Sequence, residues 1–149
     1  MADIRGWIAM AIARFYYLLA ESYRHFGNKY RLTSEYEHAI TAFTRAIAHR
    51  PDFARAYLAR GILYWREMDH PQRAILDLTR AYELDASLIE ARFNRGIAYQ
   101  QLRAYDEALV DFRAYLEKGD HPHWREYAEK MVRELTEWIS DAQDGDVPV

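Results

Sequence analysis

The residues in this chain that could do chemistry are mainly histidines and carboxylates. Asp120, His121 and His123 lie close together in the sequence, and a carboxylate with two imidazoles can ligate a metal ion. They flank Pro122 in a short polar segment, however, and such a segment is more typical of an exposed turn that leads into a helix. The sequence therefore predicts no metal site here.

No other group of residues combines a general acid, a general base and a nucleophile. His25 and His38 fall on different predicted helices, and neither has a nucleophile in a matching position. Asp106 and Glu107 are adjacent carboxylates of the kind found on the outer face of a helix. The chain has no cysteine, which excludes thiolate nucleophiles, disulfides and cysteine-based zinc sites, and it has no glycine-rich phosphate loop. Because catalysis needs several converging groups, we expect a protein that is not an enzyme and has no cofactor.

The composition indicates one folded domain that does not bind nucleic acid. Half of the 149 residues are apolar and 15% are aromatic, which excludes a disordered chain. A chain of this length buries roughly two thirds of its unfolded surface when it folds. The net charge is −3, and no cluster of lysine and arginine is present to contact phosphates. The lack of cysteine fits a reducing compartment, so we expect a cytoplasmic protein.

Three segments of the chain repeat one another. Glycine, tyrosine and alanine recur in them at spacings of 34 and 35 residues: Gly27, Gly61 and Gly96; Tyr30, Tyr64 and Tyr99; Ala39, Ala74 and Ala108. The one-residue change in spacing falls near His70, where a turn is expected. A glycine and an alanine in matching places predict that two helices approach closely, with Gly27 facing Ala39.

Apolar residues recur at steps of three and four within each segment, which predicts two helices per segment. The expected helices span residues 4–32, 35–48, 53–67, 71–84, 88–102, 105–118 and 122–140. Pro71 and Pro122 are expected at the first positions of their helices. Two residue pairs have the spacing of a capping box, Ser34 with Glu37 and Ser87 with Glu90.

These segments resemble the tetratricopeptide repeat, a helix–turn–helix unit with a period of 34 residues. The resemblance covers residues 20–120 and is carried in the first unit by Tyr23, Phe26, Gly27, Tyr30, Tyr36, Ala39, Phe43, Ala46 and Pro51. The third unit departs from the pattern at Arg92 and Tyr115, and the second has Ala86 in place of its closing proline. The family implies an all-α solenoid, a right-handed superhelix of three hairpins. The implied divisions are an apolar helical extension continuous with the first repeat (1–19), three repeats (20–53, 54–88, 89–121), a capping helix (122–140) and a flexible tail (141–149).

In this family, ligand peptides lie along the inner faces of the first helices, so the resemblance implies a scaffold or adaptor that binds a peptide or helix of a partner protein. The predicted groove residues are Arg24, Asn28, Arg31, Arg55, Leu58, Ile62, Trp65, Arg66, Glu90, Phe93, Asn94, Ile97 and Gln101. Their apolar members form a strip rimmed by arginines, as interaction sites often do. An alternative stays open for Leu58, Ile62 and Ile97, which could instead pack between adjacent helices.

Some members of the family hold the acidic C-terminus of chaperones with a clamp of lysine, arginine and asparagine. Arg24, Asn28 and Asn94 resemble parts of that clamp. Ala59 and Glu90 stand where its other members would be, and Glu90 has the wrong charge for a carboxylate ligand. We therefore expect no such clamp.

The apolar stretch before the first repeat sets this chain apart. Residues 7–20 are too few to span a bilayer, which needs about 20, and Arg14 interrupts any secretory signal. The stretch could cap the first repeat, pair with a second copy in a symmetric dimer, or lie on a membrane or partner protein. Arg5 and Arg14 are too few for strong attraction to a membrane. We predict that the stretch forms a homodimer interface made of Trp7, Ile8, Ile12, Phe15 and Leu19. The alternative function to an adaptor is then a structural subunit that assembles with copies of itself through this helix.

Overall fold

The computed structural model describes residues 4–144, and every regular element in that range is an α-helix. The helices are α1 (Ile4–Tyr30), α2 (Thr33–His49), α3 (Ala54–Arg66), α4 (Pro71–Leu84), α5 (Glu90–Gln101), α6 (Tyr105–Lys118) and α7 (Pro122–Asp144). Each predicted helix is present, with ends that differ by only a few residues from those expected.

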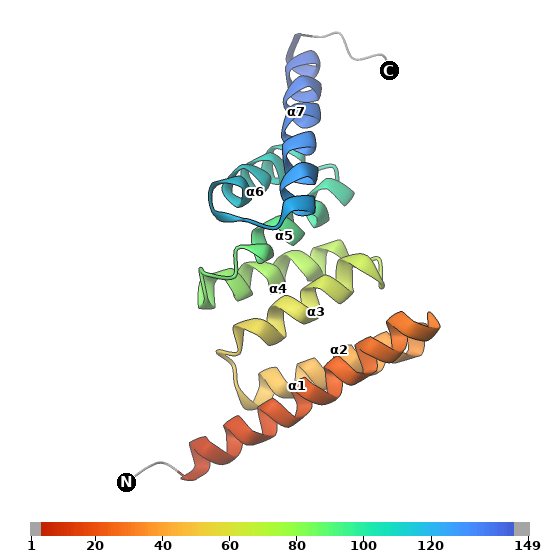
Figure 1. The fold of residues 1–149 in the computed structure, drawn as a ribbon, viewed down its shortest axis with the longest axis vertical. Coiled ribbons are helices and arrows are strands. Elements are labelled where there is room, and N and C mark those ends of the chain that lie inside the picture. Colours follow the sequence, from red (N-terminus) through yellow and green to blue (C-terminus); the bar gives the residue numbers. More distant parts are fainter. Residues whose placement is uncertain (1–3, 145–149) are drawn as a thin grey trace.

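The helices pair into hairpins that stack in chain order. α1 packs on α2, α3 on α4 and α5 on α6, while α2, α4 and α6 each also contact the helix that follows. In Figure 1 the stack is elongated, with α1 at one end and α7 at the other. Stacked units that contact mainly their neighbours are the mark of a solenoid, so the predicted all-α solenoid is confirmed.

Proline starts two helices as predicted, whereas the first capping box is absent. Pro71 and Pro122 are the first residues of α4 and α7, where a missing backbone N–H costs nothing. Helix α2 begins at Thr33 with Leu32 as its N-cap, and no side chain caps it. Ser34 therefore lies inside the first turn, and the prediction that it caps α2 was wrong.

The second capping box is also absent, because Ser87 lies two residues before Ile89, the N-cap of α5. The hydroxyl of Ser87 donates to a carboxylate oxygen of Asp85 at 2.6 Å, and the backbone N–H of Ser87 donates to the same oxygen at 3.0 Å. Helix α5 begins only at Glu90, with no side-chain cap. These hydrogen bonds lower the pKa of Asp85, since they stabilise its charged form.

The repeated glycines allow a large side chain of the second helix to lie against the first. A Cβ at Gly27 would lie 2.7 Å from a ring carbon of Tyr36, and one at Gly61 would lie 2.8 Å from Cγ of Leu78. Both distances are too short for a real contact. The residue that faces Gly27 is thus Tyr36 rather than Ala39, although Ala39 is fully buried nearby.

The turns within all three hairpins use a left-handed residue that is not glycine. Arg31, Asp69 and Arg103 have φ angles of 54°, 52° and 58° and follow the ends of α1, α3 and α5. At the first and third turns the next backbone N–H bonds back to the helix, as in a Schellman motif. A side chain in this conformation is strained, so the three turns carry a small cost in stability.

Helix α7 covers the end of the last hairpin. Met131 and Leu135 are buried, and Trp138 packs edge-on against Tyr105 with ring centroids 4.5 Å apart. Tyr127 packs edge-on against Phe112. Helix α7 therefore packs on the last hairpin through these residues. Residues 141–144 continue α7 rather than belonging to a tail, and residues 145–149 lie outside the described range.

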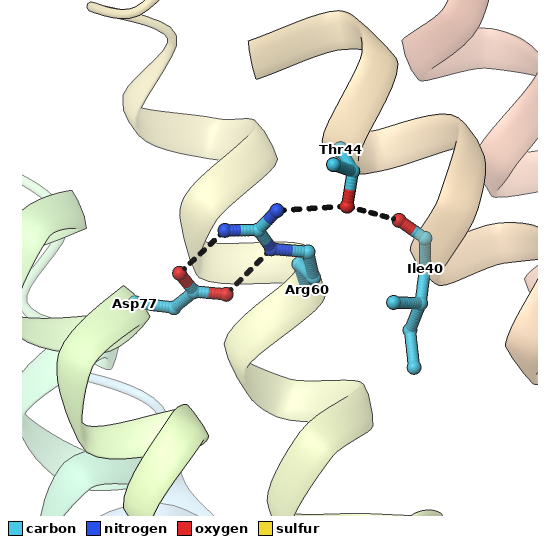
Figure 2. A network of polar contacts seen from close by, with 4 residues as sticks. All are labelled: Ile40, Thr44, Arg60 and Asp77. Carbon is cyan, nitrogen blue, oxygen red and sulfur yellow. Dashed lines mark hydrogen bonds and ion pairs between the residues drawn. The ribbon is translucent and has the colours of Figure 1, made fainter. Parts of the chain in front are cut away.

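A partly buried arginine ties three helices together in the middle of the stack. The guanidinium of Arg60 on α3 donates two hydrogen bonds to the carboxylate of Asp77 on α4, at 2.7 and 2.8 Å. It also donates to the hydroxyl of Thr44 on α2 at 2.8 Å, and that hydroxyl donates to the carbonyl of Ile40, as Figure 2 shows. Burial would lower the pKa of Arg60, but the hydrogen bonds and charge of Asp77 outweigh it and raise the pKa. One side chain thus links its own hairpin to the preceding one.

The same network recurs one unit later. Arg95 on α5 donates to Asp111 on α6 at 2.6 and 2.8 Å and to Thr79 on α4 at 2.8 Å. Asp111 also pairs with Arg92 at 3.2 Å. Each residue lies 34 or 35 positions after its counterpart in the preceding unit. The two networks therefore fix how neighbouring hairpins are set against each other.

Candidate functional site

The predicted groove residues lie on α1, α3 and α5, the first helices of the three hairpins. The structure leaves some exposed, half-buries others and buries three. Exposed are Asn28, Arg31, Arg55, Arg66 and Gln101; half-buried are Arg24, Ile62, Trp65, Glu90 and Ile97; buried are Leu58, Phe93 and Asn94. The surface open to a ligand is therefore smaller and more polar than the sequence suggests.

Trp65 is the central aromatic residue of this surface, and α5 holds its ring in place. The indole N–H of Trp65 donates to Oδ1 of Asn94 at 3.2 Å. The amide of Asn94 in turn donates to the carbonyl of Glu90 at 2.8 Å, and Gln101 donates to the backbone carbonyl of Trp65 at 3.3 Å. The ring is thus half-buried with its one donor satisfied, so it offers an ordered apolar surface to a partner.

Polar residues dominate the part of the surface between α1 and α3. A cleft of about 380 Å³ is lined by Asn28, Arg31, Thr33, Tyr36 and Glu67. Burial, and after it the charge of Glu67, raise the pKa of Tyr36. Its hydroxyl therefore stays protonated at neutral pH and donates to Oδ1 of Asn28 at 3.2 Å. This cleft can hydrogen-bond a peptide backbone or a polar side chain.

The residues that resemble a carboxylate clamp are engaged with other residues. Arg24 pairs with Glu21 on its own helix, Asn28 accepts from Tyr36, and Asn94 is buried against Trp65.

Phe93 is a core residue, contrary to the prediction that it lines the groove. Only 6% of it is exposed, because its ring stacks on Trp124 of α7 with centroids 5.2 Å apart. It also contacts Phe112, Tyr115 and Tyr127. The capping helix thus covers the inner side of α5 around Phe93.

Leu58 is likewise buried, 9% exposed, within the apolar core around α3 and α4. Ile62 packs against the same core, and Ile97 packs against the core around α5 and α6. These aliphatic residues therefore pack between helices, as the alternative hypothesis held, and do not form an apolar strip open to a ligand.

The histidines of the last turn are involved in ring packing. His121 stacks on Trp124 with centroids 4.6 Å apart, and His123 lies 6.0 Å from His121. Within residues 4–144, no group of three histidine, cysteine, aspartate or glutamate residues is arranged to hold a metal ion.

The N-terminal part of α1 presents large apolar side chains to solvent. Of the predicted interface, Trp7, Ile8 and Phe15 are exposed, while Ile12 and Leu19 are half-buried. Among the described helices, none combines the length and hydropathy needed to cross a bilayer.

Comparison with known proteins agrees with the repeat and with the stacked hairpins. A family model described as "TPR repeat" matches residues 27–67. The TPR domain of Arabidopsis OM64 superimposes with a TM-score of 0.72 at 25% identity, covering 85% of this chain and 98% of that domain. The chain belongs to the tetratricopeptide-repeat family. Its described helices pair into hairpins that stack as the helix–turn–helix units of such a solenoid do.

Two further relatives of this TPR protein are described together with chaperones or chaperone peptides. The second TPR domain of human RPAP3, solved in complex with the HSP70 peptide SGPTIEEVD, has 25% identity and a TM-score of 0.67, covering 83% of this chain and 98% of that one. Hsp70-Hsp90 organizing protein 1 of Glycine max is 30% identical over 128 residues, 86% of this chain. The match spans only 22% of that relative's own length.

The Arg60 and Arg95 networks were missed by reasoning from the sequence. Their signal was present, because the arginine, the aspartate and the threonine all recur at the repeat spacing. In the first unit the arginine and aspartate positions hold Phe26 and Ala42 instead. The arginine, aspartate and threonine therefore occur together only where one hairpin packs on the next, between α2 and α3–α4 and between α4 and α5–α6.

Proposed function

We propose that this TPR protein is a non-enzymatic adaptor that binds a peptide or helix of a partner protein along α1, α3 and α5. The observation that carries the proposal is Trp65, which α5 holds half-exposed through Asn94 and Gln101. An ordered aromatic ring beside a polar cleft offers both apolar contact and hydrogen bonds to a peptide. The peptide complex of the RPAP3 domain supports a ligand of this kind.

The mode of binding proposed here differs from capture of a free carboxylate. Ala59 and Glu90 stand at two clamp positions, and Asn94 is consumed by Trp65. We therefore propose that the ligand is an internal peptide segment or a helix. The proposed site residues are the exposed and half-buried members of the predicted groove. We place the three repeats that carry them at residues 20–53, 54–88 and 89–121. A cytoplasmic location is part of the same proposal, because the chain has no cysteine.

Affinity capture from lysate with wild type and a Trp65→Ala variant tests this function. Captured proteins are identified by mass spectrometry, and binding of the captured segment is then measured by calorimetry. Trp65→Ala is expected to abolish capture, whereas Trp138→Ala, an equal truncation on α7, is expected to leave it intact. The adaptor function is refuted if Trp65→Ala captures the same proteins as wild type.

Self-assembly through α1 is a second candidate function, favoured by the exposure of Trp7, Ile8 and Phe15. Light scattering of the full chain and of a Trp7→Ala, Phe15→Ala variant tests it. A full chain that stays monomeric at tens of micromolar excludes this function and leaves the adaptor function untouched.

A further inference from the structure

Helix α1 extends beyond the helix on which it packs. It has 27 residues, whereas α2 has 17, and in Figure 1 its first turns protrude past the rest of the stack. The buried residues of α1 are small, Ala13, Ala20 and Gly27, and tyrosines beside them pack against α2. Its other sides carry Trp7, Met10 and Leu18, which are 66%, 46% and 59% exposed. Large apolar side chains at this end of the solenoid are therefore available for contact.

Part of this surface is a cleft with an apolar floor. The cleft has a volume of about 520 Å³ and lies between α1 and the turn that joins α2 to α3. Tyr17 and Phe53 form its floor, with ring centroids 4.9 Å apart, and Tyr17 also packs against Phe43 at 5.6 Å. The hydroxyl of Tyr17 is protonated at neutral pH, as in any tyrosine, and burial raises its pKa further. The floor is thus ordered and apolar, with one neutral hydroxyl.

The border of the cleft is positively charged. Arg14, Arg50 and Arg55 line it. Arg50 pairs with Asp52 at 3.1 Å and lies over the ring of Phe53. Arg14 and Arg55 are exposed, and neither makes a hydrogen bond or ion pair with another residue in the range 4–144. Arg14 is therefore free to bind a carboxylate of a partner, and Arg55, whose charge also acts on Asp85 without an ion pair, is exposed for the same contact.

We propose that this cleft is a docking site for an acidic peptide segment, in which a bulky apolar side chain fills the space over Tyr17 and Phe53 while flanking carboxylates bind Arg14 and Arg55. Guanidinium–carboxylate pairs combine charge with directed hydrogen bonds, so they suit such a partner. A second copy of α1 fits less well, because residues 4–20 contain two arginines and no carboxylate. The site is separate from Trp65, and only Arg55 is common to this cleft and the proposed groove.

Fluorescence anisotropy with three short synthetic peptides tests the proposal on the full chain. The first peptide has aspartate and glutamate on both sides of a phenylalanine, the second replaces the phenylalanine by alanine, and the third replaces the acidic residues by lysine. Only the first is expected to bind well, and its affinity is expected to fall as salt rises, because exposed charge pairs are screened.

The variant that reports on the cleft is Arg14→Glu, and its matched control is Arg133→Glu. Arg133 is exposed on α7, at the opposite end of the stack, and its reversal changes the net charge equally. Since Arg14→Glu replaces an attraction by a repulsion, it should weaken binding of the first peptide about tenfold. Arg133→Glu and Trp65→Ala should each change it less than about twofold, as expected for sites that do not contact the peptide. Circular dichroism checks that each variant keeps its helices.

Four results would overturn the proposal. The three peptides could bind equally, or Arg14→Glu could bind the first peptide as wild type does. Trp65→Ala could weaken binding as much as Arg14→Glu, which would place the peptide in the groove. Light scattering could show a dimer that Trp7→Ala dissociates and the peptide does not, which would make a second copy the occupant. Loss of peptide binding in Arg14→Glu with binding retained in Trp65→Ala supports the cleft even if the groove proves to bind nothing.

Discussion

Removing the carboxylate of Asp77 should destabilise the protein far more than removing an exposed charge. Asp77 and Arg60 have side chains only 9% and 15% exposed, and Asp77 accepts two hydrogen bonds from Arg60, at 2.7 and 2.8 Å. Asp77→Ala leaves the largely buried guanidinium without its carboxylate, with Thr44 as its remaining hydrogen-bond partner and the rings of Tyr57 and Tyr64 beside it. Breaking a buried pair by removing one partner costs about 3–5 kcal/mol, which is a large part of the stability of a small domain.

A double-mutant cycle measured by urea unfolding separates the pair from other effects. The variants are Asp77→Ala, Arg60→Ala and both together, and the double variant should cost about 2–3 kcal/mol less than the sum of the single ones. Lys130→Ala is the control, because it breaks a pair with Glu134 whose side chains are 60% and 55% exposed. That change should cost less than about 0.5 kcal/mol. The reasoning is refuted if the double variant loses as much free energy of unfolding as the two single variants together. It is also refuted if the free energy of unfolding of Asp77→Ala is within about 1 kcal/mol of the wild-type value.

Three smaller predictions follow from local geometry. Arg103→Gly should stabilise the protein by about 0.5–1 kcal/mol in urea unfolding, because glycine adopts the left-handed turn without strain; an unchanged or lower stability would contradict this. Gly61→Ala should destabilise it by about 1–3 kcal/mol, since the new Cβ would lie 2.8 Å from Leu78, and a neutral change would show that the leucine gives way freely. In an NMR titration Asp85 should have a pKa below its usual value, and Ser87→Ala should raise that pKa. The stability contributed by Asp85 is therefore present above its unfolded-state pKa and is lost as the pH falls through the folded-state pKa. If the pKa of Asp85 is unchanged in Ser87→Ala, the hydrogen bond from Ser87 is not a cause of its low value.

The fold could be predicted from the sequence because its signals are periodic. Steps of three and four residues locate the helices, and the spacing of Gly27, Gly61 and Gly96 sets the register of the hairpins. The capping boxes failed for a local reason. Helix α2 begins at Thr33, before Ser34, and α5 begins only at Glu90, so neither serine stands at an N-cap position.

The candidate site was harder to predict because burial depends on distant parts of the chain. Phe93 lies near the start of α5, where Trp124 of α7 covers it, whereas Trp65 lies near the end of α3 and stays partly exposed beside Asn94. That difference arises from how α7 returns over α5, and helical periodicity does not contain it. The pairing of Arg60 with Asp77 likewise needs the register between two helices, although both residues recur visibly in the next unit.

The two arginine networks have a mechanical consequence for binding. Arg60 lies on the side of α3 opposite Ile62 and Trp65, since residues on a helix advance by about 100° each. By holding Thr44 of one hairpin and Asp77 of the next, it sets the angle between the two hairpins, and Arg95 sets the following angle. Those two angles determine the pitch and curvature of the whole superhelix. A substitution on this far side could therefore tighten or open the inner face and change the affinity for a ligand that it never touches.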